Sequence, residues 1–389
     1  MRNDFKITSL GPCRIGSPLN LSGFISDNNR ILFNSRIDDY ADRLDESGRP
    51  LSLECAGPRE KIFFDPAHTK AAVVTCGGLC PGINDVIRSL TMTLFYRYGV
   101  KQILGIKYGL RGLNPAFGHK PVHLTPDFVK DITHIGGSIL SSSRGPQDAD
   151  VMVDYLESMK VNILFCVGGD GTMRAAEKLT QTITARGTSI SVIGIPKTID
   201  NDLSLIERSF GFDTAIEKTV EAIRCAHVEA KGAHHGIGLV KIMGRESGYI
   251  TATAALAQGD ANFVLIPEVP FDLEGKKGFL ETLKKRMKAR EHAVILVAEG
   301  AGQELMNQGS TQRKTDASGN IRLYDIGLFL KNSIEEYFSQ QNFEINLKYI
   351  EPSYLIRSVP ANASDSIYCS LLGQYSVHAA MAGKTGLLV

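Results

Sequence analysis

The sequence predicts an α/β protein in which parallel strands alternate with helices that cross over and cover both faces of a sheet. From residue 70 onward, short runs of Val, Ile and Leu alternate with longer segments of helical period. The strand candidates are apolar throughout rather than at every second residue, which is typical of parallel strands buried on both faces. The chain of 389 residues is long enough for two or three domains, each with its own core.

The elements follow one another regularly after an irregular start. Residues 1–60 are rich in Pro, Gly, Asn and Ser and show little periodicity, so we expect an N-terminal arm that wraps or caps another part of the protein. The predicted strands cover residues 71–75, 102–107, 163–167, 191–195, 238–242, 263–266 and 293–298, and another starts at 386. The predicted helices cover residues 85–98, 172–184, 213–230, 246–257, 276–289, 325–339 and 365–382. The polar stretch 302–320 is interpreted as a surface insertion.

Composition and charge exclude several classes of function. Lys and Arg number 43 against 42 Asp and Glu, so no net field would draw nucleic acid or a membrane surface to the protein. There is no run of about 18 apolar residues, as a membrane-spanning helix requires. The first residues also lack the apolar segment of a secretory signal. The 7 cysteines are scattered without metal-ligand spacing, so we expect buried, reduced thiols and a cytoplasmic protein.

Two glycine-rich loops in the first half of the chain are candidates for holding phosphate groups. Gly77 begins a loop with three glycines that leads from a strand into a helix, and the sequence GGDGT at residues 168–172 forms a second one. Glycines let backbone N–H groups approach an anion at a helix start, and Asp170 could hold the Mg²⁺ that accompanies a nucleotide. Each loop could instead be a tight turn, with Asp170 as a helix cap, so the residues alone leave both interpretations open.

Two later strand ends carry charged residues suited to phosphoryl transfer. In the segment PKTIDND, Lys197 and Thr198 could hold phosphoryl oxygens. Asp200 and Asp202 lie two residues apart, so one could accept a hydroxyl proton while the other organises metal or water. In MGRESG, Arg245 could contact an anionic substrate. An ordinary Asn-Asp turn and a local ion pair of Arg245 are the structural alternatives.

Taken in order, these loops resemble those of the 6-phosphofructokinase family. GGLCPGIND, GGDGT, PKTIDND, MGRESG, the pair Glu299-Gly300 and SYLIR at residues 353–357 occur in family order at family-like spacing, over most of the chain from about residue 56. The arm with AGPREK at residues 56–61 and the TDASG segment at 315–319 look most like the branch found in plants, trypanosomes and some bacteria. Other kinase motifs fail, because the GKT at residues 383–385 lacks the first glycine of a P-loop and no protein-kinase motif occurs.

The resemblance implies a phosphofructokinase-like fold of two doubly wound parallel-sheet lobes with an N-terminal arm. The arm would cover residues 1–70, the nucleotide-binding lobe residues 71–211 and 356–389, and the sugar-phosphate-binding lobe residues 212–355. It implies an enzyme of glycolysis that transfers the γ-phosphoryl group of Mg-ATP to the 1-hydroxyl of fructose 6-phosphate. It also implies a homo-oligomer, with a tetramer favoured over a dimer.

By the same resemblance, Asp200 is the general base, and Thr198, Arg245 and Lys197 complete the catalytic set. The ATP-binding residues would be Gly77, Arg144, Gly145, Gly169, Asp170, Gly171 and Thr172, with Asp170 also holding Mg²⁺. Fructose 6-phosphate would be held by Thr198, Ile199, Asp200, Met243, Gly244, Arg245, Glu299, Tyr354, Leu355, Ile356 and Arg357. In bacterial relatives, two arginines of a neighbouring subunit also contact the 6-phosphate. Lys348 and Gly236 stand at those positions here, and only Lys348 can supply a charge.

Gly171 and Lys197 are markers of the phosphoryl donor. Relatives that use pyrophosphate tend to have Asp at the position of Gly171, where a negative side chain would crowd and repel the α-phosphate of ATP. Lys197 is the opposite marker, since many ATP enzymes have Gly there. The plant- and trypanosome-like branch combines this Gly with this Lys and uses ATP, so we expect ATP. A pyrophosphate-dependent enzyme and a non-catalytic regulatory homologue remain the alternatives, while an NAD or lipid kinase would share only the GGDGT loop.

Overall fold

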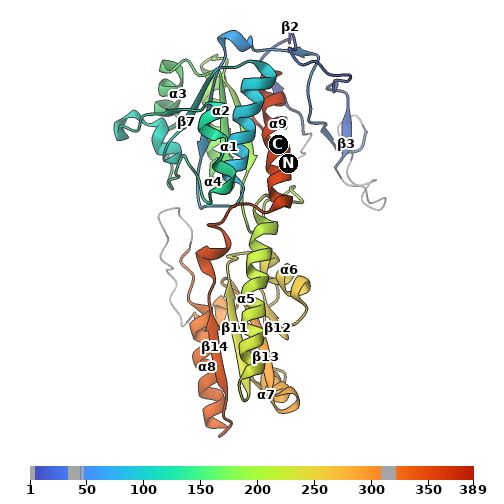
Figure 1. Ribbon diagram of the computed structural model, residues 1–389, viewed down its shortest axis with the longest axis vertical. Coiled ribbons are helices and arrows are strands. Elements are labelled where there is room, and N and C mark those ends of the chain that lie inside the picture. Colours follow the sequence, from blue (N-terminus) through green and yellow to red (C-terminus); the bar gives the residue numbers. More distant parts are fainter. Residues whose placement is uncertain (1–4, 34–43, 45–47, 308–320) are drawn as a thin grey trace. The chain divides into compact units, whose positions relative to one another are not determined.

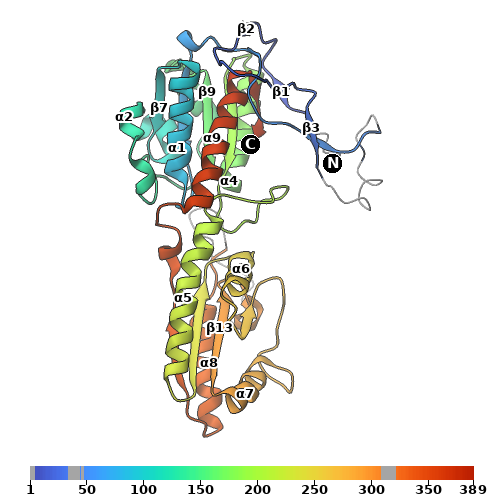
Figure 2. The same ribbon diagram turned by 45° about the vertical axis from the view of Figure 1, so that its right-hand side comes forward.

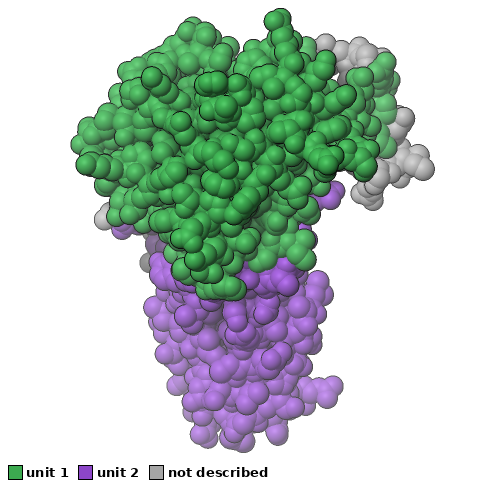
Figure 3. Space-filling view, turned by 45° about the horizontal axis from the view of Figure 1, so that its top comes forward, with its two compact units in different colours: residues 1–197, 366–389 green, residues 198–365 purple. Residues whose placement is uncertain are grey.

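Two parallel sheets organise the protein, one in each of its two units (Figure 3). The computed structural model describes residues 5–33, 44, 48–307 and 321–389. Unit 1 comprises Met1–Lys197 and Ser366–Val389, and unit 2 comprises Thr198–Asp365. Most of the predicted insertion at 302–320, including TDASG, lies outside the described residues. The strands and helices alternate as the apolar runs predict, which confirms the α/β fold class.

The sheet of unit 1 has six strands in the order β16-β10-β9-β6-β7-β8, parallel except for β8. These strands are β6 (Lys70–Thr75), β7 (Gln102–Ile106), β8 (Val122–His123), β9 (Ile163–Gly168), β10 (Ser191–Pro196) and β16 (Leu387–Leu388). One face packs against α3 (Ala149–Ser158) and α4 (Asp170–Ala185) in a single apolar cluster. The other face carries α1 (Ile83–Met92) and α9 (Ala363–Met381), which lie side by side, with Ser89 Oγ donating to the Ser370 carbonyl at 2.6 Å (Figure 1).

The sheet of unit 2 has four parallel strands in the order β12-β13-β11-β14. They are β11 (Gly236–Ile242), β12 (Phe263–Leu265), β13 (His292–Ala298) and β14 (Asn346–Ile350). The helices α7 (Phe279–Arg290) and α8 (Ile326–Gln340) share an apolar cluster with one face of this sheet. The long helix α5 (Phe212–Gly232) runs along β11, next to α6 (Tyr249–Gln258) (Figure 2).

Glycines in β11 let α5 approach the strand closely. A Cβ atom added at Gly236 would lie 2.0 Å from the Ala230 carbonyl oxygen, and one added at Gly238 would lie 2.7 Å from that of Ala226. Real Cβ atoms do not come so near a backbone oxygen, so both positions require glycine. The close packing follows from the absence of two side chains.

The N-terminal arm packs against the C-terminal segment of its own unit. The strand β1 (Thr8–Ser9) pairs with β15 (Lys384–Thr385), β2 (Ile15–Gly16) with β5 (Lys61–Ile62), and β3 (Arg30–Leu32) with β4 (Ser52–Glu54), all antiparallel. The Lys384 side chain is only 10% exposed and lies 2.7 Å from Asp27 Oδ2 and 3.3 Å from Glu54 Oε1. Ion pairs therefore join the two ends of the sequence.

Several element bounds differ from those that periodicity predicts. The predicted helix at 85–98 is α-helical only to Met92 and continues as a π-helical segment, η3 (Thr93–Tyr98). The predicted helix at 246–257 begins three residues later, because Gly244 (φ +136°) belongs to a loop that ends at the N-cap Gly248. The predicted helix at 276–289 begins only after Gly278, at Phe279. The remaining short helices are α2 (Pro126–Val129), η2 (Pro66–His68), η4 (Gly109–Leu113), η5 (Pro115–Phe117), η6 (Ile132–His134), η7 (Gln303–Met306) and η8 (Ser353–Ile356).

The units also divide the chain at other places than the predicted lobes do. The prediction divides it at 211/212 and 355/356, whereas the chain leaves unit 1 after Lys197 and returns at Ser366. Residues 198–211 group with unit 2 because they bond to one another and to its loops. For example, Ser247 Oγ, in the loop after β11, donates to the Asp200 carbonyl at 3.1 Å. What each unit binds stays a prediction. Within the described ranges, no helix is long and apolar enough to span a membrane.

Candidate functional site

In unit 1, the predicted donor-binding residues gather at the carboxyl ends of β6, β9 and β10. These three strands are neighbours in one parallel sheet, so the loops that follow them leave from the same edge. The loop after β6 begins at Gly77 (φ +80°), where an L side chain would be strained. The Gly77 carbonyl accepts from Ser142 Oγ at 2.7 Å, and the Gly77 N–H donates to the Ser143 carbonyl at 3.3 Å. These bonds bring the segment with Arg144 and Gly145 beside the Gly77 loop.

Lys197 lies between the two glycine loops. Its side chain is almost fully buried, and its ammonium donates to the Gly78 carbonyl at 2.6 Å. Its backbone N–H donates to the Gly168 carbonyl at 2.9 Å. One residue thus ties the loop after β6 to the loop after β9, a role that the sequence analysis did not foresee.

The GGDGT loop leads into α4, with Gly169 at the N-cap and Asp170 in the first turn. The Thr172 N–H donates to the Gly169 carbonyl at 2.8 Å, which closes the turn. A Cβ added at Gly168 would lie 2.2 Å from Thr172 Oγ1, whereas one added at Gly171 would meet no atom within 4 Å. The position of Gly171 is therefore open, and its lack of a side chain is not required by packing.

Asp170 is the one predicted metal ligand. Its carboxylate is 69% exposed and pairs with Arg174 Nη1 at 2.8 Å. Among the residues that the structure describes, no group of three or more His, Cys, Asp or Glu side chains could hold a metal ion. A single exposed carboxylate fits Mg²⁺ that is held mainly by nucleotide phosphates and water, which is a common way of binding this ion.

In unit 2, the loop that starts at Thr198 is stabilised by its own polar side chains. The Asp200 N–H donates to Thr198 Oγ1 at 3.1 Å, and that hydroxyl donates to Asp202 Oδ1 at 3.1 Å. Ser247, from the MGRESG loop, donates through Oγ to the Asp200 carbonyl at 3.1 Å. The side chain of Ile199 is buried. The backbone around Asp200 is thereby fixed from both sides.

The Asp200 carboxyl is strongly perturbed. Its pKa is raised from 3.8 to about 7, mainly by burial and also by the charges of Asp202 and Glu299, while Arg357 and Arg245 act against this rise. Two carboxylates and two guanidinium groups from four different loops therefore act on one side chain. A carboxyl whose pKa lies near neutrality can both hold and release a proton at physiological pH, which suits a general base.

Arg245 and Glu299 meet because β11 and β13 are neighbouring parallel strands. The Gly300 N–H donates to the Gly244 carbonyl at 3.1 Å, so the two strand ends stay paired beyond the sheet. A Cβ added at Gly300 would lie 1.7 Å from the Arg245 carbonyl oxygen, which no side chain permits. The Arg245 guanidinium donates to the Ile321 carbonyl. Burial raises the pKa of Glu299, against the charge of Arg245.

The segment after β14 supplies the remaining predicted sugar-phosphate residues. In η8, Tyr354 and Leu355 are exposed, and Ile356 is buried. The Arg357 guanidinium lies over the Tyr354 ring, 4.8 Å from its centroid. Lys348 is different, because it lies within β14, opposite Gly238, and is exposed. Within one chain, Lys348 does not join the strand-end cluster around Asp200.

Two residues at or next to this cluster, Ser247 and Lys241, were not predicted as site residues. Ser247 lies inside the MGRESG motif, but its bond to the Asp200 carbonyl could not be foreseen from the motif. Lys241 is a charged residue near the end of an otherwise apolar strand, and its side chain is only 11% exposed. A lysine in such a strand is itself a signal, since a buried charge needs partners.

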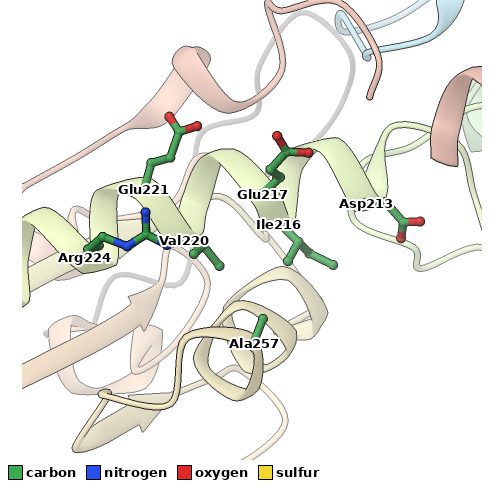
Figure 4. A pocket seen from close by; sticks show the side chains of 7 residues that line it. All are labelled: Asp213, Ile216, Glu217, Val220, Glu221, Arg224 and Ala257. Carbon is green, nitrogen blue, oxygen red and sulfur yellow. The ribbon is translucent and has the colours of Figure 1, made fainter. Parts of the chain in front are cut away.

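A groove in unit 2 lies elsewhere, between α5 and α6 (Figure 4). Its lining residues are Asp213, Ile216, Glu217, Val220, Glu221, Arg224 and Ala257. None of them is a predicted site residue. The strand-end cluster is the better candidate, because it combines converging charges with a perturbed carboxyl.

Comparison with known proteins decides the family. A family model described as Phosphofructokinase matches residues 70–380. The chain belongs to the phosphofructokinase family. It is similar to proteins named ATP-dependent 6-phosphofructokinase from Borreliella burgdorferi and Trypanosoma brucei brucei. The first is 50% identical over 99% of this chain and 88% of the relative, and the second is 45% identical over 92% and 73%. The ATP-dependent 6-phosphofructokinase 7 of Arabidopsis thaliana is 49% identical over 87% of this chain and 69% of the relative.

Solved phosphofructokinases share the fold. A pyrophosphate-dependent phosphofructokinase from Marinobacter aquaeolei matches with a TM-score of 0.67 and 21% identity, over 82% of this chain and 77% of that one. The T-state phosphofructokinase of Pichia pastoris matches with a TM-score of 0.63 and 22% identity over 80% of this chain, which spans 32% of that longer chain. At such identities the likeness supports the fold alone.

Proposed function

We propose that the protein is an ATP-dependent 6-phosphofructokinase, which transfers the γ-phosphoryl group of Mg-ATP to the 1-hydroxyl of fructose 6-phosphate in glycolysis. The observation that carries this proposal is the Asp200 carboxyl, which two acidic and two basic side chains from the predicted loops influence and whose pKa burial, above all, raises to about 7. The relatives that match nearly the whole chain bear the same activity in their names. The motifs around Asp200 are those through which the sequence resembles the family.

In this reaction, Asp200 accepts the proton of the attacking 1-hydroxyl. A primary hydroxyl is a poor nucleophile, and a carboxylate within reach that takes its proton as attack proceeds is sufficient for general base catalysis. Thr198 and Arg245 stabilise the charge of the phosphoryl group in flight. Lys197 and Thr198 are consecutive, so one peptide bond joins the donor loops to the acceptor loop.

The other charges hold the two substrates. Arg357 binds the 6-phosphate, for which its planar fork is better suited than an ammonium group. Glu299 accepts hydrogen bonds from sugar hydroxyls, and Met243, Gly244 and the 354–356 segment complete the sugar site. Asp170 would hold Mg²⁺ together with the phosphates of the donor, and the ion would supply neutralisation of negative charge there.

ATP is favoured over pyrophosphate as the donor. Gly171 has free space where its side chain would stand, so the α-phosphate and nucleoside of ATP meet no steric or charged barrier there. Lys197 is the residue of pyrophosphate-using relatives, but its ammonium is bonded to the Gly78 carbonyl, so its presence does not by itself argue for pyrophosphate. The pyrophosphate-dependent enzyme is the second candidate function.

We further propose a cytoplasmic homo-oligomer, with a tetramer favoured over a dimer. The exposed position of Lys348 suits a residue that reaches the 6-phosphate of a neighbouring copy. Light scattering after gel filtration measures the state, and a monomer with full activity would contradict this part of the proposal.

A donor-by-acceptor activity matrix tests the function. The purified protein is assayed with ATP or pyrophosphate against fructose 6-phosphate and against sedoheptulose 7-phosphate, with Asp200→Asn as the control. We expect turnover with ATP and fructose 6-phosphate that the variant loses. Activity with pyrophosphate alone would establish the second candidate. Binding of fructose 6-phosphate without turnover from either donor would instead indicate a regulatory homologue.

A further inference from the structure

Lys241 forms an ion-pair network next to the sugar-phosphate cluster, with two carboxylates that are 40% and 38% exposed. It lies in β11, and its side chain is 11% exposed. Its Nζ atom lies 3.0 Å from Asp325 Oδ1 and 3.0 Å from Glu351 Oε1. Burial alone would lower the pKa of Lys241, but Glu351 and Asp325 outweigh it and raise this pKa, so the side chain remains charged at neutral pH. A buried ammonium with two carboxylates is rarely the most stabilising choice for such a place, since apolar residues of similar volume often do as well or better.

Each partner belongs to a segment with a fixed position. Asp325 is the N-cap of α8 and accepts from the Leu328 N–H at 3.1 Å. Glu351 directly follows β14 and precedes Pro352, η8 and Arg357. Its second oxygen accepts from the Tyr349 hydroxyl at 3.1 Å. Glu351 is thus held by bonds to both of its carboxylate oxygens.

The network begins where the backbone pairing ends. The β11–β14 ladder closes with the pair Val240 and Ile350, one residue before Lys241 and Glu351. Beyond that point, the ion pair between Lys241 and Glu351 joins the next residue of each strand. The segment 243–245 follows β11, and the segment 354–357 follows β14. The network therefore sits at the base of both predicted sugar-phosphate segments.

We propose that Lys241 is a positioning residue for the sugar-phosphate site. Through its ion pairs with Glu351 and Asp325, it holds the segment that carries Arg357 at a fixed distance from the segment that carries Arg245. This inference rests on the proposed function for its substrate, but not for its geometry. Two arginines share one anionic ligand only while the loops that bear them keep a fixed separation. A shift of about 1 Å in one loop is enough to lose much of that benefit.

The structure offers a closely matched control. Lys384 is 10% exposed and also pairs with two carboxylates, but it lies in β15 of unit 1, and its partners belong to the N-terminal arm. We compare Lys241→Met with Lys384→Met and with Lys241→Arg. In Lys241→Met, we expect the KM for fructose 6-phosphate to rise about 10-fold, with the KM for ATP and kcat within about twofold of wild type. Lys384→Met should leave both KM values unchanged, and Lys241→Arg should keep most of the affinity of wild type for fructose 6-phosphate.

A second readout is independent of catalysis. Hydrogen exchange followed by mass spectrometry should show faster amide exchange over residues 351–357 in Lys241→Met, and not in Lys384→Met. If Lys241→Met does not fold, the triple variant Lys241→Met, Asp325→Asn, Glu351→Gln, which leaves no unpaired charge, takes its place in both measurements. Unchanged exchange in this segment, or equal increases in both KM values, would overturn the inference. If wild type shows no turnover with either donor, the proposed function fails, and the exchange measurement still decides the role of Lys241.

Discussion

Replacing Asp200 with Asn should stabilise the protein while removing its activity. The folded state raises the pKa of Asp200 from 3.8 to about 7, so at neutral and alkaline pH folding must either keep an unfavourable negative charge or bind a proton. A shift of about three units corresponds to about 4 kcal/mol at most, and the partial exposure of the side chain reduces this to about 2 kcal/mol. Asn has nearly the same shape and no charge, so it avoids this cost.

The gain in stability that we expect for Asp200→Asn depends on pH. A carboxyl whose pKa is raised on folding destabilises the native state only where the unfolded chain ionises it. The gain in Asp200→Asn should therefore be absent below pH 3.8, grow as the pH rises toward about 7, and stay constant above it. Urea unfolding followed by circular dichroism at pH 5 and pH 8 measures this difference.

The activity of wild type should follow the same group. Below pH 7, kcat/KM for fructose 6-phosphate should fall about 10-fold per pH unit as Asp200 becomes protonated, and Asp200→Asn should lower kcat by about 10²–10⁴-fold. Asp127→Asn is the control, because Asp127 is exposed and its pKa is lowered by a hydrogen bond to Lys130, so this variant should gain no stability. An Asp200→Asn variant that is less stable at pH 8 than wild type, or that keeps its activity, would refute the reasoning.

Three further substitutions test the loops around this group. Gly300→Ala should lower the free energy of unfolding by about 2 kcal/mol or more and disrupt catalysis, because the added Cβ would lie 1.7 Å from the Arg245 carbonyl oxygen. Chemical denaturation measures the loss of stability. A variant that is fully active and as stable as wild type would contradict the packing. Gly171→Asp should fold normally, since its side chain enters open space, yet raise the KM for ATP about 10-fold or more while leaving fructose 6-phosphate binding by calorimetry unchanged. Arg357→Lys keeps the charge but loses the planar fork, so the KM for fructose 6-phosphate at saturating ATP should rise about 10-fold, and an unchanged KM would remove Arg357 from the 6-phosphate site.

The central strands could be predicted well because their burial leaves a continuous apolar signal. β9 and β10 are buried along their whole length, and the predicted bounds differ by a single residue at one end. β14 escaped prediction for the opposite reason. It is an edge strand whose residues Asn346 and Lys348 are exposed, so its alternation is short and weak.

The site was predictable to the extent that it lies in contiguous loops. Asp200, Arg245 and Glu299 could be predicted because each follows a recognisable strand. Neighbouring parallel strands explain why Arg245 and Glu299 lie at one edge, but not the place of Asp200, because β10 belongs to the other sheet. The bonds that hold these loops in place connect residues distant in sequence, such as Lys197 with the Gly78 carbonyl and Lys241 with Glu351. A single sequence contains no signal for such pairings, because they depend on the distance in the folded protein between segments that are far apart in the sequence.

The two glycines of β11 have a consequence for how unit 2 can move. On the strand they are two residues apart, which spans about 6.6 Å, and the α5 carbonyls that they face belong to residues four apart, which span about 6 Å along the helix. The two spacings agree, so both glycines lie under α5 carbonyls at the same time. Sliding α5 along β11 would bring an oxygen against a side chain on the same face of the strand, such as Val240. Shear between them is therefore blocked. Adjustment to a bound sugar phosphate must come from the loops at the strand ends, which α5 and β11 carry as a single rigid body.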